Sequence, residues 1–145
     1  MAKSLGELKA VVARLRSPSG CPWDRKQTHR SLIPFVREES AELAEALARG
    51  RWHEIEDELG DILFHVMLLS RVAEEKGWFT LEDVARSQAL KLRRRHPHVF
   101  ARDRKFRTAG EVLEHWKSIK SEERALRDRD VTARGRRRAP RRRKA

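Results

Sequence analysis

Residues 38–61 read EESAELAEALARGRWHEIEDELGD, and this stretch decides the fold. Apolar residues recur at helical spacing on both sides of Gly50, and the glycine itself interrupts the pattern. Glycine is common just past the end of a helix because it adopts the left-handed conformation without strain. The stretch therefore predicts an antiparallel hairpin of two helices.

The same stretch carries nine acidic side chains among its 24 residues, in a chain whose net charge is +12. Like charges three or four residues apart on a helix repel one another. Glu42 and Glu58 are each eight residues from Gly50, and Glu39 and Asp61 are each eleven residues from it. In an antiparallel pair, residues equidistant from the turn lie at the same height, here roughly 12–16 Å from it. Four carboxylates at the margin of a core predict a bound cation, and an all-oxygen set suits Mg²⁺ or Mn²⁺.

Two other interpretations of these acids have to be weighed. A helix face rich in glutamate is usually just solvated, and the positions alone leave that alternative open. A di-iron site is disfavoured, because it requires Glu-x-x-His pairs and the sequence has none. We expect His65 to hydrogen-bond a neighbouring carboxylate rather than to bind metal. Glu38 and Asp57 each adjoin a proposed ligand and are predicted to support the site.

The rest of the chain is also helical in pattern, with no strand pattern and no internal repeat, so we predict an all-α helical bundle built around the hairpin. Ser4 with Glu7, Thr80 with Asp83 and Thr108 with Glu111 have the spacing of capping boxes. The expected helices are residues 4–16, 31–49, 53–76, 80–95 and 108–124, with a turn-rich connector at 21–29.

Length and composition set the class of protein. The 145 residues fit one domain with one core. The single cysteine, Cys21, permits no internal disulfide, and the longest apolar run is far short of the ~20 residues that a membrane span needs. We therefore expect a soluble, cytoplasmic protein with no membrane partner.

The basic charge is concentrated at the C-terminal end. Residues 134–145 hold eight of the 34 basic residues and no acidic one, so the net charge without them is +4. Such a run is predicted to be disordered. We divide the chain into a helical domain, residues 1–125, and a basic tail, residues 126–145.

Cations that could bind phosphates lie on the last two helices. Lys91 and Arg95 are four residues apart, and so are Trp116 and Lys120. An indole beside a lysine suits a nucleobase and its phosphates, since stacking on an aromatic ring tolerates any base. Taken singly, Trp116 is more often a core residue and each cation more often a solvated one.

Six linked motifs carry a resemblance. They are Cys21-Pro-Trp-Asp, Gln27-Thr-His, Glu38-Glu-Ser-Ala-Glu42, Glu58-Leu-Gly-Asp61, Lys91-Leu-Arg-Arg-Arg-His-Pro-His-Val-Phe100 and Trp116-Lys-Ser-Ile-Lys120. Over roughly residues 5–125 the chain resembles the MazG family of nucleoside triphosphate pyrophosphohydrolases. The chain departs from some members in having Phe35 in place of a lysine.

The resemblance implies hydrolysis of a nucleoside triphosphate to a monophosphate and pyrophosphate, with cleavage between the α- and β-phosphates. It implies that Mg²⁺ is bound by Glu39, Glu42, Glu58 and Asp61, and nucleotide by Lys91, Arg95, Trp116 and Lys120. Glu38 and Glu39 are our candidates for the general base. The resemblance also supports a homodimer or a higher assembly, which the amphipathic helices favour independently.

Two rival functions remain at this point. A nucleic-acid-binding module would use residues 134–145 to neutralise about eight phosphates, since the rest of the chain taken together has a net charge of only +4. A catalytically silent helical scaffold would show no stabilisation by divalent ions. Trp23, Trp52, Trp78 and Phe79 are either core or interface residues.

Overall fold

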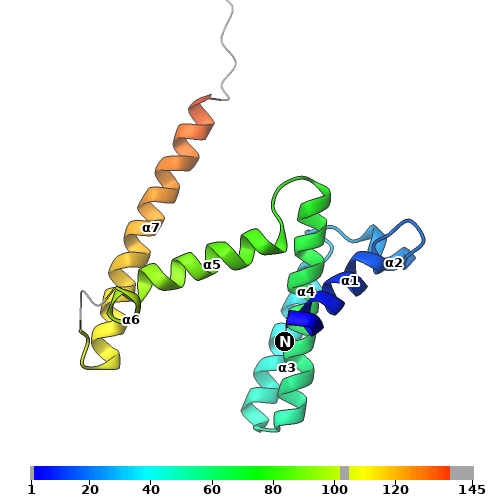
Figure 1. The fold of residues 1–145 in the computed structure, drawn as a ribbon, viewed down its shortest axis with the longest axis horizontal. Coiled ribbons are helices and arrows are strands. Elements are labelled where there is room, and N and C mark those ends of the chain that lie inside the picture. The colour runs from blue at the N-terminus through cyan, green and yellow to red at the C-terminus, as the bar shows by residue number, and fades with distance from the viewer. Residues whose placement is uncertain (1, 102–104, 138–145) are drawn as a thin grey trace, which may run out of the picture. The chain divides into compact units, whose positions relative to one another are not determined.

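The computed structural model describes residues 2–101 and 105–137, and its side chains through residue 125. The described residues contain helices and no strand, which confirms the all-α prediction (Figure 1). The chain divides into two compact units, Met1–Ser87 and Gln88–Ala145, and each is described here by itself. The helices are α1 (Ala2–Leu15), α2 (Pro22–Lys26), α3 (Ile33–Arg49), α4 (Trp52–Glu75), α5 (Leu81–Arg95), α6 (Pro97–Phe100) and α7 (Ala109–Arg137).

The predicted hairpin is formed by α3 and α4, which run side by side. Gly50 ends α3 with a φ of 70°, in the left-handed region, and its N–H donates to the Ala46 carbonyl at 3.0 Å. Arg51 is extended, and α4 begins at the next residue. A left-handed glycine followed by one extended residue thus reverses the chain within two positions.

The core lies in the first unit, where α1 packs on the α3–α4 hairpin. Its buried cluster consists of Val12, Leu32, Met67 and Leu68. The apolar residues that recur at helical spacing on either side of Gly50 are therefore not all buried, because Leu47, Leu59 and Val66 are exposed. The buried side chains of α4 lie between His65 and Ala73, in the half of the helix nearer its C-terminal end.

Helix ends show which capping predictions were right. The box at Thr80 and Asp83 is confirmed, since the Asp83 N–H donates to Thr80 Oγ1 at 3.2 Å and the Thr80 N–H to Asp83 Oδ2 at 3.0 Å. The box at Ser4 is wrong, because α1 already begins at Ala2.

At the third predicted box, the Glu111 N–H donates to Thr108 Oγ1 at 3.3 Å. The Glu111 carboxylate accepts from the Arg107 N–H instead of the Thr108 N–H. The hydrogen bond from the Glu111 N–H to the Thr108 hydroxyl is thus confirmed, and the reciprocal bond predicted for the Glu111 side chain is not.

The connector between α1 and α3 contains a short helix, α2, that the sequence did not predict. Arg16, whose side chain is only 7% exposed, fixes this connector. Its Nη1 donates to the backbone oxygens of Asp24 and Gln27, at 2.5 and 3.2 Å, and its Nη2 pairs with Glu75 at 2.6 Å. The arginine therefore ties the connector to the end of α4.

The second unit differs from the first in the burial of its hydrophobic side chains. Every hydrophobic side chain that is buried among the described residues belongs to the first unit. Helix α7 continues to Arg137, past the end predicted near residue 124, so the tail is helical in part. Residues 138–145 lie outside the described residues, and both the disorder of the tail and the domain boundary at residue 125 stay predictions. Among the described residues, no helix has the length and apolar character needed to cross a membrane.

Candidate active site

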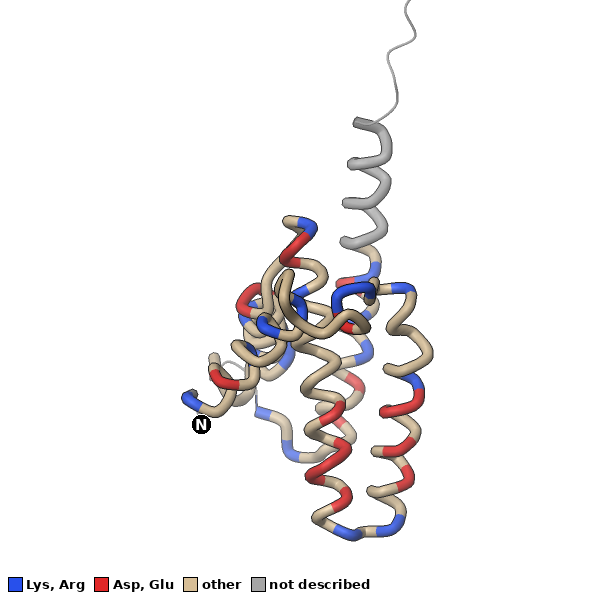
Figure 2. Tube along the Cα trace, turned by 90° about the vertical axis from the view of Figure 1, so that its right-hand side faces the viewer, with Lys and Arg blue, Asp and Glu red and all other residues tan. Residues whose placement is uncertain are grey.

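Acidic residues line both helices of the hairpin, and the turn between them is basic (Figure 2). Three of the four predicted metal ligands meet here. One carboxylate oxygen from each of Glu39, Glu58 and Asp61 lies within 4.8 Å of the others. Glu39 comes from α3 and the other two from α4, so the hairpin geometry inferred from distances to Gly50 brings them together.

The electrostatics of the cluster reflect this crowding. Burial raises the pKa of Glu39, and the nearby Asp61 raises it further, while His65 acts in the opposite direction. Burial likewise raises the pKa of Glu58, followed by the charges of Glu42 and Asp61. Each negative charge therefore disfavours its neighbours, which is a cost that a bound cation would remove.

A buried atom in the cluster lacks a partner. Oε2 of Glu58 is shielded from solvent and accepts no hydrogen bond from any described residue. Buried carboxylate oxygens are normally hydrogen-bonded or bound to metal, since an unpaired one loses its hydration without compensation. The cluster thus has the donor set and the unmet oxygen expected of a site for a hard divalent cation.

Two further acids of the hairpin, Glu42 and Glu38, lie outside the group of three carboxylates. Glu42 is exposed and outside the group of three, although its charge is close enough to raise the pKa of Glu58. Glu38 is also exposed, and its charge contributes to the raised pKa of Glu39. The structure therefore places both at the rim of the cluster.

His65 differs from expectation. It is buried in α4, and its Nδ1 lies 3.0 Å from the backbone oxygen of Asp61. The prediction of a hydrogen bond to a carboxylate is therefore wrong for this nitrogen. Helical side chains point back toward the N-terminal end of their helix, so the His65 ring reaches the backbone carbonyl of the residue four positions earlier, Asp61.

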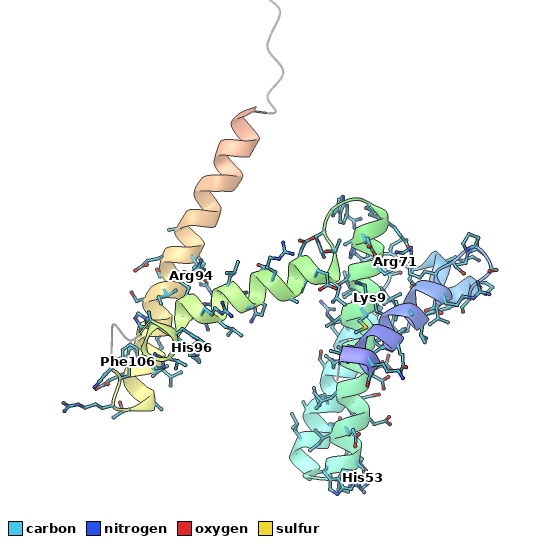
Figure 3. All side chains as sticks on the ribbon, in the orientation of Figure 1. Lys9, His53, Arg71, Arg94, His96 and Phe106 are labelled. Atoms are coloured by element: carbon cyan, nitrogen blue, oxygen red, sulfur yellow. The ribbon has the colours of Figure 1, made fainter. Side chains whose placement is uncertain are left out.

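The second unit contains the predicted nucleotide-binding residues, and two of them are in contact. Trp116 Nε1 of α7 donates to the backbone oxygen of Arg95 at 3.0 Å. The indole also makes an edge-on contact with His96, with ring centroids 4.9 Å apart. Arg94 and His96 lie at the end of α5 and the start of α6, where α7 packs beside them (Figure 3).

A residue that sequence reasoning missed organises this region. Glu123 of α7 is only 8% exposed and forms ion pairs with both Arg94 and Arg95. The hydrogen bonds from the two guanidinium groups lower its pKa to about 2. No pattern in the sequence marks this contact, because the partners are separated by 28 and 29 residues and lie on different helices.

The other two predicted cations are not brought into this cluster. Lys91 is half-buried and Lys120 is exposed, and neither forms an ion pair with a described residue. Trp23, Trp52, Trp78 and Phe79 are all largely exposed, which excludes the core for these four aromatics and leaves the interface alternative.

Two cavities lie away from the predicted residues. One, of about 110 Å³, is in the first unit and is lined in part by Lys9 and Arg71 (Figure 3). Another, of about 480 Å³, is in the second unit beside Phe106 and His115. Neither is lined by a predicted metal ligand or nucleotide-binding residue.

The fold and the site together define an all-α protein with a carboxylate cluster on a helix hairpin. The family model "MazG nucleotide pyrophosphohydrolase domain" matches residues 27–100 of the chain. The chain therefore belongs to the MazG family.

Curated relatives agree with this assignment. The chain is 43% identical over 122 residues to a nucleoside triphosphate pyrophosphohydrolase of Escherichia coli K12, a match that covers 83% of the chain and 46% of the relative. It is 45% identical over 117 residues to a nucleoside triphosphate pyrophosphohydrolase/pyrophosphatase MazG of Thermotoga maritima, covering 81% of the chain and 44% of the relative. The chain spans less than half the length of these relatives.

A solved structure is similar over nearly its whole length. The crystal structure of a mazG-related protein from Thermotoga maritima aligns with a TM-score of 0.64 and 28% identity. The alignment covers 80% of this chain and 98% of that one. The likeness supports the all-helical architecture described above.

Proposed function

We propose that this chain is a nucleoside triphosphate pyrophosphohydrolase that cleaves between the α- and β-phosphates and depends on a divalent cation. The observation that carries the proposal is the meeting of Glu39, Glu58 and Asp61 within 4.8 Å of one another. The names of the E. coli and T. maritima relatives support the same reaction class.

The metal would be held by the hairpin carboxylates. Glu39, Glu58 and Asp61 would each offer a carboxylate oxygen, and Glu42 at the rim would complete the predicted set. The orphaned Oε2 of Glu58 supports this fit, because a cation would compensate its burial. Oxygen ligands favour Mg²⁺, with Mn²⁺ as the alternative. When bound, the ion supplies positive charge against the phosphate oxygens and the departing pyrophosphate.

The chain's own side chains would move the proton and bind the nucleotide. Glu38 and Glu39 are the candidates for the base that takes a proton from the attacking water, and Glu38 is the exposed one of the two. Arg95, with Lys91 and Lys120, would bind phosphate oxygens by charge-assisted hydrogen bonds. Trp116 would offer its ring to the base, which favours a site tolerant of base identity.

The experiment that tests the proposal is substitution at the rim of the cluster. We expect Glu42→Gln to abolish Mg²⁺-dependent release of pyrophosphate from nucleoside triphosphates while helicity by circular dichroism is kept. Glu45→Gln is the matched control, since it lies one turn further along α3 and loses only an exposed ion pair with Arg49. Full activity in the Glu42 variant would remove these carboxylates from the mechanism.

We also propose that the chain acts as a homodimer or a larger homo-oligomer. Hydrophobic side chains such as Trp52, Leu59 and Phe100 are more than half exposed. A second copy would cover apolar surface that a single chain leaves in water. A cytoplasmic location is proposed as well, which the free thiol of Cys21 favours.

A further inference from the structure

We propose that Glu123 is a positioning residue for nucleotide binding, holding the guanidinium of Arg95 so that its outer edge faces a phosphate. The inference rests on the proposed function, because it assigns Glu123 a task only if Arg95 binds the substrate. It adds a residue that none of the sequence motifs contains.

The contact has the geometry of a two-point clamp. Arg95 Nη2 lies 2.5 Å from Glu123 Oε2, and Arg95 Nε lies 3.4 Å from Oε1. A carboxylate that meets both Nε and Nη2 fixes the plane of the guanidinium as well as its position. The Arg95 side chain is only 17% exposed, so the clamp operates where water competes weakly.

The clamp leaves part of Arg95 available. A guanidinium has five N–H donors, and Glu123 engages those on one edge. Nη1 of Arg95 forms no hydrogen bond to any other described residue. Arg95 therefore has donors left for an oxyanion while the opposite edge is held fixed.

The charges of the cluster remain favourable to an anion. Glu123 is ionised at neutral pH, since its two arginine partners lower its pKa to about 2. Arg94 pairs with the same carboxylate but keeps a side chain that is 62% exposed. Two guanidinium groups against one carboxylate leave a net positive charge, so Glu123 orients Arg95 without cancelling its attraction for phosphate.

The backbone extends the effect to Trp116. Its indole N–H donates to the carbonyl of Arg95, one of the last carbonyls of α5, which have no partner within the helix. Holding Arg95 in place thus also holds the acceptor that orients the indole. The arginine and the aromatic predicted to bind nucleotide are fixed by one buried carboxylate.

Kinetics of Glu123→Gln test the proposal, because the amide keeps the shape and loses the charge. We expect KM for the nucleoside triphosphate to rise about tenfold while kcat stays within about twofold. Glu123 is not one of the proposed metal ligands, so stabilisation of the nucleotide-free variant by Mg²⁺ should match that of the unsubstituted protein. Glu122→Gln is the matched control, since Glu122 is the exposed neighbour of Glu123 on α7 and accepts a hydrogen bond from Ser118 rather than from either arginine. It should change KM by less than about twofold.

A second measurement does not depend on turnover. The indole N–H of Trp116, assigned by nuclear magnetic resonance with a Trp116→Phe variant, should exchange with solvent faster in Glu123→Gln than in Glu122→Gln. Should Glu123→Gln lose helicity, Arg95→Lys replaces it with Glu123 intact. Lysine cannot pair with carboxylate and phosphate through two edges, so the same rise in KM is expected.

The outcomes separate this inference from the proposed function. An unchanged KM in Glu123→Gln, or in Arg95→Lys if that variant is used, overturns the positioning role in an otherwise active enzyme. Unchanged exchange of the Trp116 indole overturns its coupling to Trp116. Absence of pyrophosphate release from the unsubstituted protein overturns the proposed function and this inference with it.

Discussion

Glu58 shows at the scale of a single residue how stability and chemistry compete. Its carboxylate sits against α3 with one oxygen buried and unpaired, and with Glu39 and Asp61 close by. Burial and these neighbours raise its pKa, so the charged form is disfavoured in the metal-free protein. A residue that served only the fold would be expected to avoid such an arrangement.

The first prediction concerns this residue. In EDTA, Glu58→Gln should melt at a higher temperature than the unsubstituted protein, because the variant no longer carries the crowded negative charge. With Mg²⁺ at about 100 times its Kd, the unsubstituted protein should gain about 2.7 kcal/mol in free energy of unfolding, and the variant much less. Thermal denaturation with and without Mg²⁺ measures both effects.

Glu56→Gln is the control for this experiment. Glu56 is exposed on α4 two positions away and forms no ion pair with a described residue. Its response to Mg²⁺ should equal that of the unsubstituted protein. A full Mg²⁺ response in Glu58→Gln would exclude Glu58 from the metal site.

Individual residues also show how far sequence reasoning extends. The meeting of Glu39, Glu58 and Asp61 followed from their distances to Gly50, since a helix hairpin has a regular rise and a known turn. Glu123 and Arg16 could not be found in this way. Their partners are on other helices, at separations where the chain path between them is irregular, so no periodicity relates them.

At the scale of helices and turns, Gly50 determines the hairpin. Its φ of 70° is strained for any residue with a side chain, while a Cβ built there would meet no atom within 4 Å. The second prediction is that Gly50→Ala lowers the free energy of unfolding by about 1 kcal/mol through backbone strain alone. Denaturant titration followed by circular dichroism measures the change.

Gly60 provides the opposite case within α4. It has ordinary helical geometry and equally open space around the position of a Cβ. Gly60→Ala should therefore raise the free energy of unfolding by about 0.5–1 kcal/mol. Equal effects of the two substitutions would show that the conformation of Gly50 does not limit stability.

The third prediction is the pH dependence of the packing of α7 against the end of α5. The arginines lower the pKa of Glu123 from 4.5 to about 2 in the folded chain. The stability that Glu123 contributes is therefore fully present above about pH 4.5 and is lost as the pH falls toward 2. Denaturation between pH 6 and pH 2 should show a shallower acid loss in Glu123→Gln, and identical pH profiles would contradict the ion pairs.

The capping motif predicted the start of α5 correctly and the start of α1 incorrectly, and the difference has a physical reason. Thr80 follows a break at Gly77, so the capping box there is the first place where a helix can start. Ser4 follows residues that are themselves able to enter a helix, and α1 begins at Ala2. A capping motif therefore sets a boundary only when the preceding chain cannot continue the helix.

At the scale of the whole molecule, the burial of apolar side chains is uneven. Buried hydrophobic residues occur in Met1–Ser87, whereas in the described part of Gln88–Ala145 Leu90, Val99 and Phe100 are about 60% exposed. The sequence predicted a single core, and it could not show where that core ends, because apolar periodicity is the same for a covered and an uncovered face.

The fourth prediction follows from this distribution. We expect sedimentation equilibrium to give a mass of at least twice 17.0 kDa at micromolar concentration. Phe100→Glu should weaken the assembly if that surface is covered by another copy, whereas Arg86→Glu on exposed α5 serves as a charge control. A monomer at every concentration would contradict the proposed self-association.

The tie formed by Arg16 has a practical consequence for engineering. Arg16 connects two carbonyls of the segment between α1 and α3 to Glu75 at the end of α4. We therefore expect this segment to unfold together with the hairpin, and insertions in it to destabilise the fold. Gly20 reinforces this, since a Cβ there would lie 2.1 Å from the Leu15 oxygen. The tip at Gly50 is held by local contacts such as the Arg49–Glu54 ion pair, so an affinity tag or fluorophore loop inserted there would cost those contacts but leave the Arg16 tie and the buried core in place.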